Sequence, residues 1–447
     1  MSSSESVMNR IRFISTQSNS EPCTFTEAMT RGLAPDGGLY LPNRFPVLSG
    51  KFWNGIEDLS LQEIAYQFTE PYFETDDQKK LIHEVIMDAL DFDAPLVRLH
   101  DNLYILELFH GPTLAFKDFG ARFMARAYAG LHDRKHGELT ILVATSGDTG
   151  SAVAHGFFGV EGTRVCLLYP SGKVSPLQEK QMTTLGKNIT ALEIEGTFDD
   201  CQKLVKQAFN DEDLRNKKNV SSANSINIAR LIPQSFYYAY ALAQLRKKFG
   251  NKHRPVFSVP SGNFGNLTAG LIAMKMGMPV SRFIAATNRN DIVPNFLKSG
   301  NFDPKPSIQT ISNAMDVGNP SNFERILKIF NGSIDEIRSN IWGKSFNDDQ
   351  TRKCIKDTFQ NTGYIADPHT AVGLLASDVY MKQTGDELPS VVLSTAHPAK
   401  FGNIVEKEIG QKVPVPARLE ECMNRPKQSV KMKNNYDLFR EYLLANN

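Results

Sequence analysis

Two segments of this chain repeat one strand–turn–helix pattern, and this repetition strongly limits the possible folds. The apolar run 140–144 ends in the glycine-rich turn 145–150, and the apolar run 256–260 ends in the turn 261–266. An apolar helical pattern follows each turn. Alternation of strands and helices favours an α/β fold with parallel sheets covered by helices on both faces. Ligands bind beyond the carboxyl ends of the strands in such sheets, and both turns lie there.

The alternation continues along most of the chain. The predicted strands are 103–108, 139–144, 164–168, 189–194, 255–259, 282–286 and 390–394. The predicted helices include 61–73, 119–131, 151–158, 199–209, 232–248 and 267–276. A chain of 447 residues is long enough for two or three domains with ample cores.

Both glycine-rich turns are candidate anion sites. Each directs several backbone N–H groups toward one point, and the following helix adds partial positive charge there. Neither turn has a nucleotide fingerprint: Arg338 stands where a phosphate-binding loop ending in Gly343-Lys344-Ser345 needs its first glycine. For either turn taken alone, a purely structural need for glycine in a tight connection is an equal explanation.

Lys117 follows the strand 103–108 and the Gly111-Pro112 turn, directly before a helical pattern. Its apolar neighbours at 114–116 predict a partly desolvated amine, although a single lysine is more often solvated. Desolvation lowers the pKa of an amine, and an uncharged amine condenses with an aldehyde. A lysine of this kind beside two anion-binding turns is the pattern of pyridoxal phosphate chemistry.

Composition excludes several classes of function. The net charge of +1 gives no bulk attraction to nucleic acid or an anionic membrane. The five cysteines are spread along the chain without a C-x-x-C pair, so we expect a reducing compartment, no disulfide framework and no metal site. No run is long and apolar enough to span a bilayer. We expect a cytoplasmic protein, monomeric or homodimeric.

Eight segments together resemble the threonine synthase family, in the family's order and over nearly the whole chain. They are 31–40, 110–119, 144–150, 224–227, 260–265, 312–316, 367–371 and 395–401. The resemblance implies a fold type II pyridoxal phosphate enzyme, a carbon–oxygen lyase that converts O-phospho-L-homoserine and water to L-threonine and phosphate. This last step of threonine biosynthesis proceeds by γ-elimination and β-addition.

The resemblance also implies that the cofactor lies between two α/β domains. We expect an N-terminal domain at 1–92, a smaller domain at 118–225, and a larger cofactor-binding domain at 93–117 and 226–447.

The resemblance assigns the cofactor contacts. Lys117 forms the Schiff base and moves protons at Cα. Backbone N–H groups of the turn after strand 255–259 hold the cofactor phosphate, and the residues are Gly262, Asn263, Phe264, Gly265 and Asn266. Many members carry aspartate where Asn266 stands. The hydroxyl of Thr395 meets the pyridine nitrogen, with Ser394 as the rival. Asp148 turns toward the cofactor or toward backbone donors.

Two further groups are substrate candidates. The residues expected at the substrate carboxylate are Ser146, Gly147 and Thr149, with the N–H groups of Gly147 and Gly150 as the anion ligands. The polar patch Asn224, Ser225, Asn227 and Arg230 is expected at the substrate phosphate, where a guanidinium matches phosphate oxygens. Lys180 is a second cationic candidate for that phosphate.

Three other functions remain as alternatives. A phospho-lyase would use the same cofactor and release 2-oxobutyrate. A non-catalytic paralogue would be expected to lack Lys117 or the turn 261–266, and both are present. A nucleotide-binding protein would use the glycine-rich turns to bind an adenosine phosphate, and it would show no visible chromophore.

Overall fold

The computed structural model describes residues 10–131, 137–250 and 252–445, and these contain three β-sheets. The smallest sheet pairs β1 (Phe13–Ser15) with β2 (Tyr40–Pro42) in antiparallel orientation. The two larger sheets confirm the expected α/β fold, with an N-terminal extension before them.

The larger sheet has six strands in the order β11-β10-β9-β12-β4-β3, and only β3 is antiparallel to its neighbour. Their bounds are β3 (Leu96–His100), β4 (Leu103–Glu107), β9 (Val256–Pro260), β10 (Arg282–Thr287), β11 (Ile341–Ser345) and β12 (Ser390–Ser394). All residues of β9 and β12 are buried, as expected for parallel strands covered on both faces.

The smaller sheet has five parallel strands in the order β13-β7-β6-β5-β8. Their bounds are β5 (Leu139–Ala144), β6 (Thr163–Pro170), β7 (Ile189–Glu195), β8 (Asn219–Ser222) and β13 (Val430–Lys433). The helices around it are α6 (Lys117–Leu131), α7 (Asp148–Phe157), α8 (Pro176–Thr183), α9 (Phe198–Asn210) and α10 (Glu212–Lys217).

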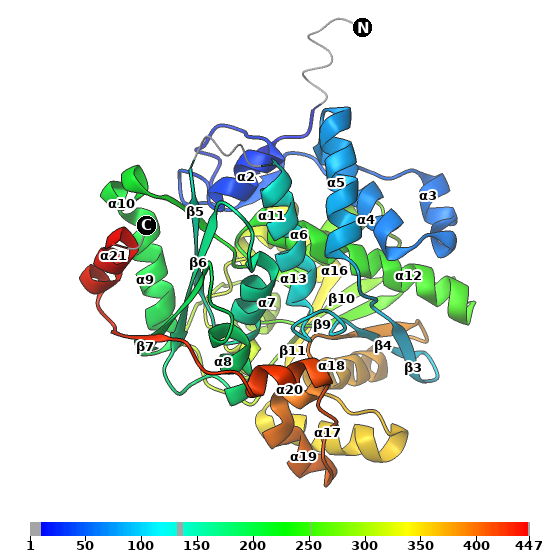
Figure 1. Cartoon of the computed structure of the whole chain (residues 1–447). Helices are drawn as coiled ribbons and strands as arrows, with labels where there is room; N and C mark the ends of the chain where they lie inside the picture. The colour runs from blue at the N-terminus through cyan, green and yellow to red at the C-terminus, as the bar shows by residue number, and fades with distance from the viewer. Residues whose placement is uncertain (1–9, 132–136, 251, 446–447) are drawn as a thin grey trace, which may run out of the picture.

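The C-terminal segment corrects the expectation that residues 226–447 belong to the larger unit. After α20 (Ala417–Met423), β13 pairs with β7 at the edge of the smaller sheet. The last helix, α21 (Tyr436–Ala445), lies beside α9 in Figure 1 and shares its apolar core. The sequence of β13 does not predict this position, because the strand is short and half of its residues are polar. Its pairing depends on the free edge of β7, which lies far from it in the sequence.

The N-terminal residues form helices in the upper part of Figure 1, and one of them, α4 (Leu61–Thr69), packs against α12 (Phe236–Phe249). The other helices of this part are α2 (Phe25–Arg31), α3 (Gly50–Asn54) and α5 (Asp76–Ala89). Capping boxes define the starts of α4 and α5, with Ser60 paired to Glu63 and Thr75 paired to Gln78.

The remaining helices surround the larger sheet. They are α11 (Ile228–Leu231), α13 (Gly265–Lys275), α14 (Ile292–Ser299), α15 (Phe323–Ile329), α16 (Ile334–Asn340), α17 (Asp348–Thr362), α18 (Pro368–Thr384) and α19 (Gly402–Ile409). No helix among the described residues has the length and apolarity needed to cross a membrane.

Candidate active site

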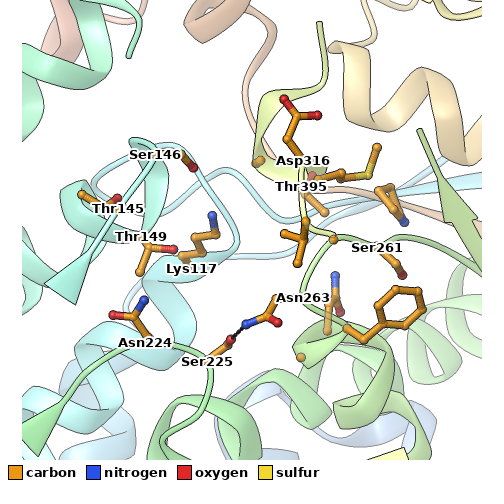
Figure 2. Close-up of a pocket in the computed structure, with 18 of the residues that line it drawn as sticks. Lys117, Thr145, Ser146, Thr149, Asn224, Ser225, Ser261, Asn263, Asp316 and Thr395 are labelled. Carbon is orange, nitrogen blue, oxygen red and sulfur yellow. Dashed lines mark hydrogen bonds between the residues drawn. The ribbon is translucent and has the colours of Figure 1, made fainter. Parts of the chain in front are cut away.

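One pocket lies between the two sheets, where the segments after β4, β5, β9 and β12 meet. Figure 2 shows Lys117 between the turn that carries Ser146 and Thr149 and the segment that carries Thr395. The described residues that line the pocket include Phe116, Lys117, Thr145, Ser146, Thr149, Asn224, Ser225, Arg230, Gln234, residues 260–266, residues 313–317, His369 and Thr395. The pocket therefore brings together most of the predicted site residues.

Lys117 is the first residue of α6, and the segment before it is fixed to the segment after β12. The N–H of Phe116 donates to the Thr395 carbonyl at 2.9 Å, and the N–H of His397 donates to the Leu114 carbonyl at 3.1 Å. Leu114 adopts a left-handed φ of 58° between them. Two segments from neighbouring parallel strands thus hold the lysine at the sheet edge.

The amine of Lys117 lies in an electrostatically unusual place. Removal from water lowers its pKa; the negative charge of Asp148 opposes this effect, and Lys400 and Arg230 add to it, so the pKa falls to about 8. An amine with this pKa is partly uncharged near neutral pH, which agrees with the sequence prediction of a desolvated nucleophile.

The turn 261–266 leads into α13 without a side-chain cap. Phe264 occupies the N-cap position with a left-handed φ of 59°, and its side chain makes no capping hydrogen bond to the first N–H groups of the helix. Asn263 fixes the turn, because its amide donates to Ser225 Oγ at 2.7 Å and accepts from the Ser321 N–H at 2.6 Å. Uncapped N–H groups at a pocket wall form an anion site.

Asn266 has a well-defined orientation in the first turn of α13. Its Oδ1 accepts from the hydroxyls of Tyr237 at 2.6 Å and Tyr238 at 2.8 Å. Its Nδ2 is buried without a hydrogen-bond partner among the described residues, and the side chain lines the pocket. An amide here offers an anion two free donors, whereas a carboxylate at the same position would offer none.

The structure distinguishes Thr395 from Ser394. Thr395 lines the pocket, whereas the Ser394 hydroxyl is buried and lies 2.8 Å from the Thr370 hydroxyl. Thr395 is therefore placed to meet a ligand, and Ser394 is not.

The turn 145–150 differs from the sequence prediction. The N–H groups of Gly147 and Gly150, expected to bind an anion, both donate to Thr145 Oγ1, at 3.0 and 2.8 Å. A threonine at the start of the turn thus satisfies these donors internally. The side chains of Ser146 and Thr149 do line the pocket.

Asp148 also departs from expectation, because its side chain turns toward neither the pocket nor backbone donors. Its Oδ1 lies 2.7 Å from Lys400 Nζ and accepts from Gln178 Nε2 at 2.9 Å. Burial alone would raise the pKa of this carboxyl, but the cations Lys400 and Lys117 and the hydrogen bonds hold it well below its usual range. A buried carboxylate needs such a cation, and sequence spacing gave no indication of Lys400.

The polar patch 224–230 divides into two groups. Asn227 does not line the pocket: its Nδ2 donates to the Met29 and Ser222 carbonyls, each at 2.8 Å, and its Oδ1 caps α11. Asn224, Ser225 and Arg230 line the pocket. Lys180, the other cationic candidate, lies outside it and donates to the Arg425 carbonyl.

Arg230 is buried without an ion-pair partner among the described carboxylates. Within the described part of the chain, its guanidinium donates only to the carbonyls of Ala223 and Lys117, and its Nε has no partner there. Burial lowers its pKa to about 10, so the group stays charged at neutral pH. A buried guanidinium of this kind supplies the local positive potential that the net charge of +1 does not.

Sequence reasoning missed three residues that shape the pocket. Fully buried Arg325 donates to the carbonyls of Tyr40, Ser225 and Ile226 and so ties the polar patch to the N-terminal extension. His369 accepts from the Ala314 N–H through Nε2 at 3.2 Å and contacts Asp367 through Nδ1 at 2.7 Å. His369 and Asp367 both lie in the segment 367–371, which contributes to the family resemblance. Nothing else in the sequence pointed to a role for these two residues.

Asp316 is the third missed residue, and Figure 2 shows it at the pocket wall. It accepts from Thr310 Oγ1 at 2.7 Å and from Asn288 Nδ2 at 2.8 Å. Burial raises its pKa to about 6, although these hydrogen bonds oppose the rise.

The residues present fit pyridoxal phosphate. A desolvated amine faces the pocket, an uncapped helix start and the free Asn266 amide can hold a phosphate, and the Thr395 hydroxyl lies on a third side. These features match the aldehyde, phosphate and ring of that cofactor.

Comparison with known proteins identifies the class of enzyme to which this chain belongs. Residues 90–396 match the family model described as pyridoxal-phosphate dependent enzyme. With its two sheets and the site between them, the chain is a pyridoxal phosphate-dependent enzyme of fold type II. Residues 12–90 match the model of the threonine synthase N terminus, and residues 370–443 match the model of the threonine synthase C-terminal part.

Individual relatives narrow the family further. The chain is 45% identical to the threonine synthase of Haemophilus influenzae over 95% of this chain and 97% of that protein. The crystal structure of threonine synthase from Escherichia coli is similar with a TM-score of 0.90 at 40% identity, covering 98% of this chain and all of that one. A structure of threonine synthase from Brucella melitensis with bound pyridoxal phosphate has a TM-score of 0.90 at 35% identity, covering 97% and 99%. The chain belongs to the threonine synthase family.

Proposed function

We propose that this enzyme converts O-phospho-L-homoserine and water to L-threonine and phosphate. The observation that carries the proposal is one pocket that holds the Lys117 amine, the uncapped start of α13 and the unpaired guanidinium of Arg230. The first two suit the cofactor, and the third suits a substrate with a second phosphate.

The cofactor phosphate is held by the N–H groups of the turn 261–266 and by the Asn266 amide. The tyrosines behind Asn266 direct that amide into the pocket. Thr395, which lines the pocket, would meet the ring nitrogen. When bound, pyridoxal phosphate withdraws electrons from Cα of an amino acid substrate. A hydroxyl partner cannot protonate the ring nitrogen, which moderates that withdrawal and favours elimination and addition over transamination.

The substrate carboxylate binds at the hydroxyls of Ser146 and Thr149, which line the pocket on the smaller-sheet side. Arg230 and Asn224 face the substrate phosphate. The guanidinium pays little new desolvation when the phosphate binds, because it is already buried. These two anion contacts fix Cα, Cβ and Cγ relative to Lys117.

Lys117 moves the protons. Its amine, with a pKa near 8, takes the proton from Cα and returns protons later in the cycle. A proton leaves Cβ as phosphate leaves Cγ, and protons then return to Cγ and Cα while the hydroxyl of water adds at Cβ. The segment 313–317, held by His369 and Asp316, covers one wall of the pocket and limits the access of bulk water.

The domain division follows the two sheets. We place the smaller unit near residues 118–225 with the strand β13 and helix α21 added, the larger unit at 93–117 and from 226 to the end of α20, and the N-terminal unit at 1–92. All five cysteines are free thiols, which agrees with action in a reducing compartment such as the cytoplasm. We expect a monomer or a homodimer.

The test supplies the purified holoenzyme with O-phospho-L-homoserine and separates amino acids from keto acids. We expect one L-threonine per phosphate released. Release of phosphate with 2-oxobutyrate instead of threonine would identify a phospho-lyase, and no phosphate release would overturn both readings.

A further inference from the structure

Lys400 is a buried lysine beside the active amine that no step above uses. It lies in the short 3₁₀ helix Pro398–Phe401, and its side chain is fully buried. Its Nζ contacts Asp148 Oδ1 at 2.7 Å and donates to the Thr113 carbonyl at 2.9 Å. Both partners belong to segments that carry site residues.

The two partners belong to segments that follow strands of different sheets. Thr113 belongs to the segment that leads from β4 to Lys117, and its N–H and hydroxyl are bound by Asp118 at 2.8 and 2.7 Å. Asp148 begins α7, directly after the turn that carries Ser146. Through one nitrogen, Lys400 therefore connects the larger sheet to the smaller sheet beside Lys117.

Stability alone does not explain this ion pair. Replacement of a buried ion pair by apolar residues is often neutral or stabilising, because desolvation offsets the attraction between the charges. The pair is placed where its two charges act on a third group, since both Asp148 and Lys400 influence the Lys117 amine in opposite directions.

We propose that Lys400 is a positioning residue for the reaction: together with Asp148, it fixes the place and the charge state of the Lys117 amine between the two sheets. The proposal rests on the role given above to Lys117. The charged groups that act on this amine are Asp148, Lys400 and Arg230, and of these only Asp148 favours its protonated form.

The test measures the acidity of Lys117 directly, in full-length protein from which the cofactor has been removed. Acetic anhydride acylates uncharged amines, so the extent of Lys117 labelling against pH, read by mass spectrometry, gives its titration midpoint. The same titration on D148N, K400M and the double variant separates the two charges. K427M serves as the matched control, because Lys427 forms ion pairs with Glu179 and Glu193 and does not line the pocket.

The two single variants should move the midpoint in opposite directions. D148N removes the carboxylate that favours the protonated amine and should lower the midpoint by about one pH unit or more, and K400M should raise it by a similar amount. The double variant and K427M should stay close to wild type. In the holoenzyme, K400M should lower kcat by about tenfold or more and change KM for the substrate much less.

A wild-type midpoint in folded D148N or K400M would overturn the proposal. If K400M fails to fold with an uncompensated carboxylate, D148N decides, because asparagine keeps the shape and the acceptor for Gln178. Labelling does not depend on catalysis. If the variants shift the midpoint but the wild-type enzyme makes no threonine, the proposed function is refuted. The proposal that Lys400 and Asp148 control the Lys117 amine would still hold.

Discussion

The backbone N–H of Phe116 donates to the carbonyl of Thr395 at 2.9 Å, and this bond joins the residue directly before Lys117 to the predicted cofactor contact that lies farthest from it in the sequence. It exists because β4 and β12 are parallel neighbours, so the segments that follow them leave the same sheet edge. The lysine and the hydroxyl thus share one rigid platform.

Replacement of Lys117 by alanine should remove the cofactor bond and the proton carrier together. We expect K117A to lose the borohydride-reducible visible chromophore and to lose activity by at least about 10³-fold. K180A is the control, because Lys180 donates to the Arg425 carbonyl outside the pocket and should keep both. Visible absorbance and threonine release measure the two effects; a coloured, reducible K117A protein would place the cofactor elsewhere.

Arg230 should govern affinity for the phosphorylated substrate. Hydrogen bonds to charged groups contribute about 1.5–3 kcal/mol, so R230M should reduce kcat/KM by about 10- to 100-fold, chiefly through KM. R230K keeps the charge without the planar fork and should fall between R230M and wild type. Inhibition by inorganic phosphate should weaken in parallel. If R230M kept the wild-type KM and phosphate inhibition, the guanidinium would have only a structural role.

Gly147 should tolerate no side chain. Its φ is 138°, and an added Cβ would lie 2.5 Å from Gln178 Cδ, the side chain that donates to Asp148. Gly159 has a positive φ of 73° with open space around its Cβ position, so G159A isolates the backbone cost of about 1–2 kcal/mol. We expect G147A to lower the thermal midpoint more than G159A and, unlike G159A, to reduce activity. Equal midpoints would show that the turn adapts.

Asp316 should make stability depend on pH. Its pKa in the folded protein is raised to about 6, so the folded state binds a proton more tightly than the unfolded chain. The stability that wild type gains from this proton is present below the unfolded pKa near 4 and is lost as pH rises through 6.

The matched variant is D316N, which cannot titrate. The stability of wild type relative to D316N should fall by about 2 kcal/mol between pH 4 and pH 7. Urea unfolding of the two proteins across this range measures the difference. A constant difference would show that Asp316 titrates alike in both states.

The sequence alone determined the local pieces of this protein. The apolar runs 139–144 and 390–394 located β5 and β12 at the predicted residues, and the turn 261–266 was a candidate anion site because its backbone chemistry is local. Lys117 became a candidate only together with the two glycine-rich turns, because a single lysine among apolar neighbours is more often solvated. Family membership followed from eight separated segments and is confirmed by the relatives.

The tertiary structure alone decided what each polar side chain does. Gly147 and Gly150 have their N–H groups satisfied by Thr145, Asn227 is used to cap α11, and Asp148 is paired with Lys400 from the other end of the chain. The pairing of β13 with β7 in the smaller sheet was likewise decided by the tertiary structure. Periodicity reports how a segment meets the core, but a hydrogen bond or ion pair between distant segments depends on which strands lie side by side, and that order is a property of the whole fold.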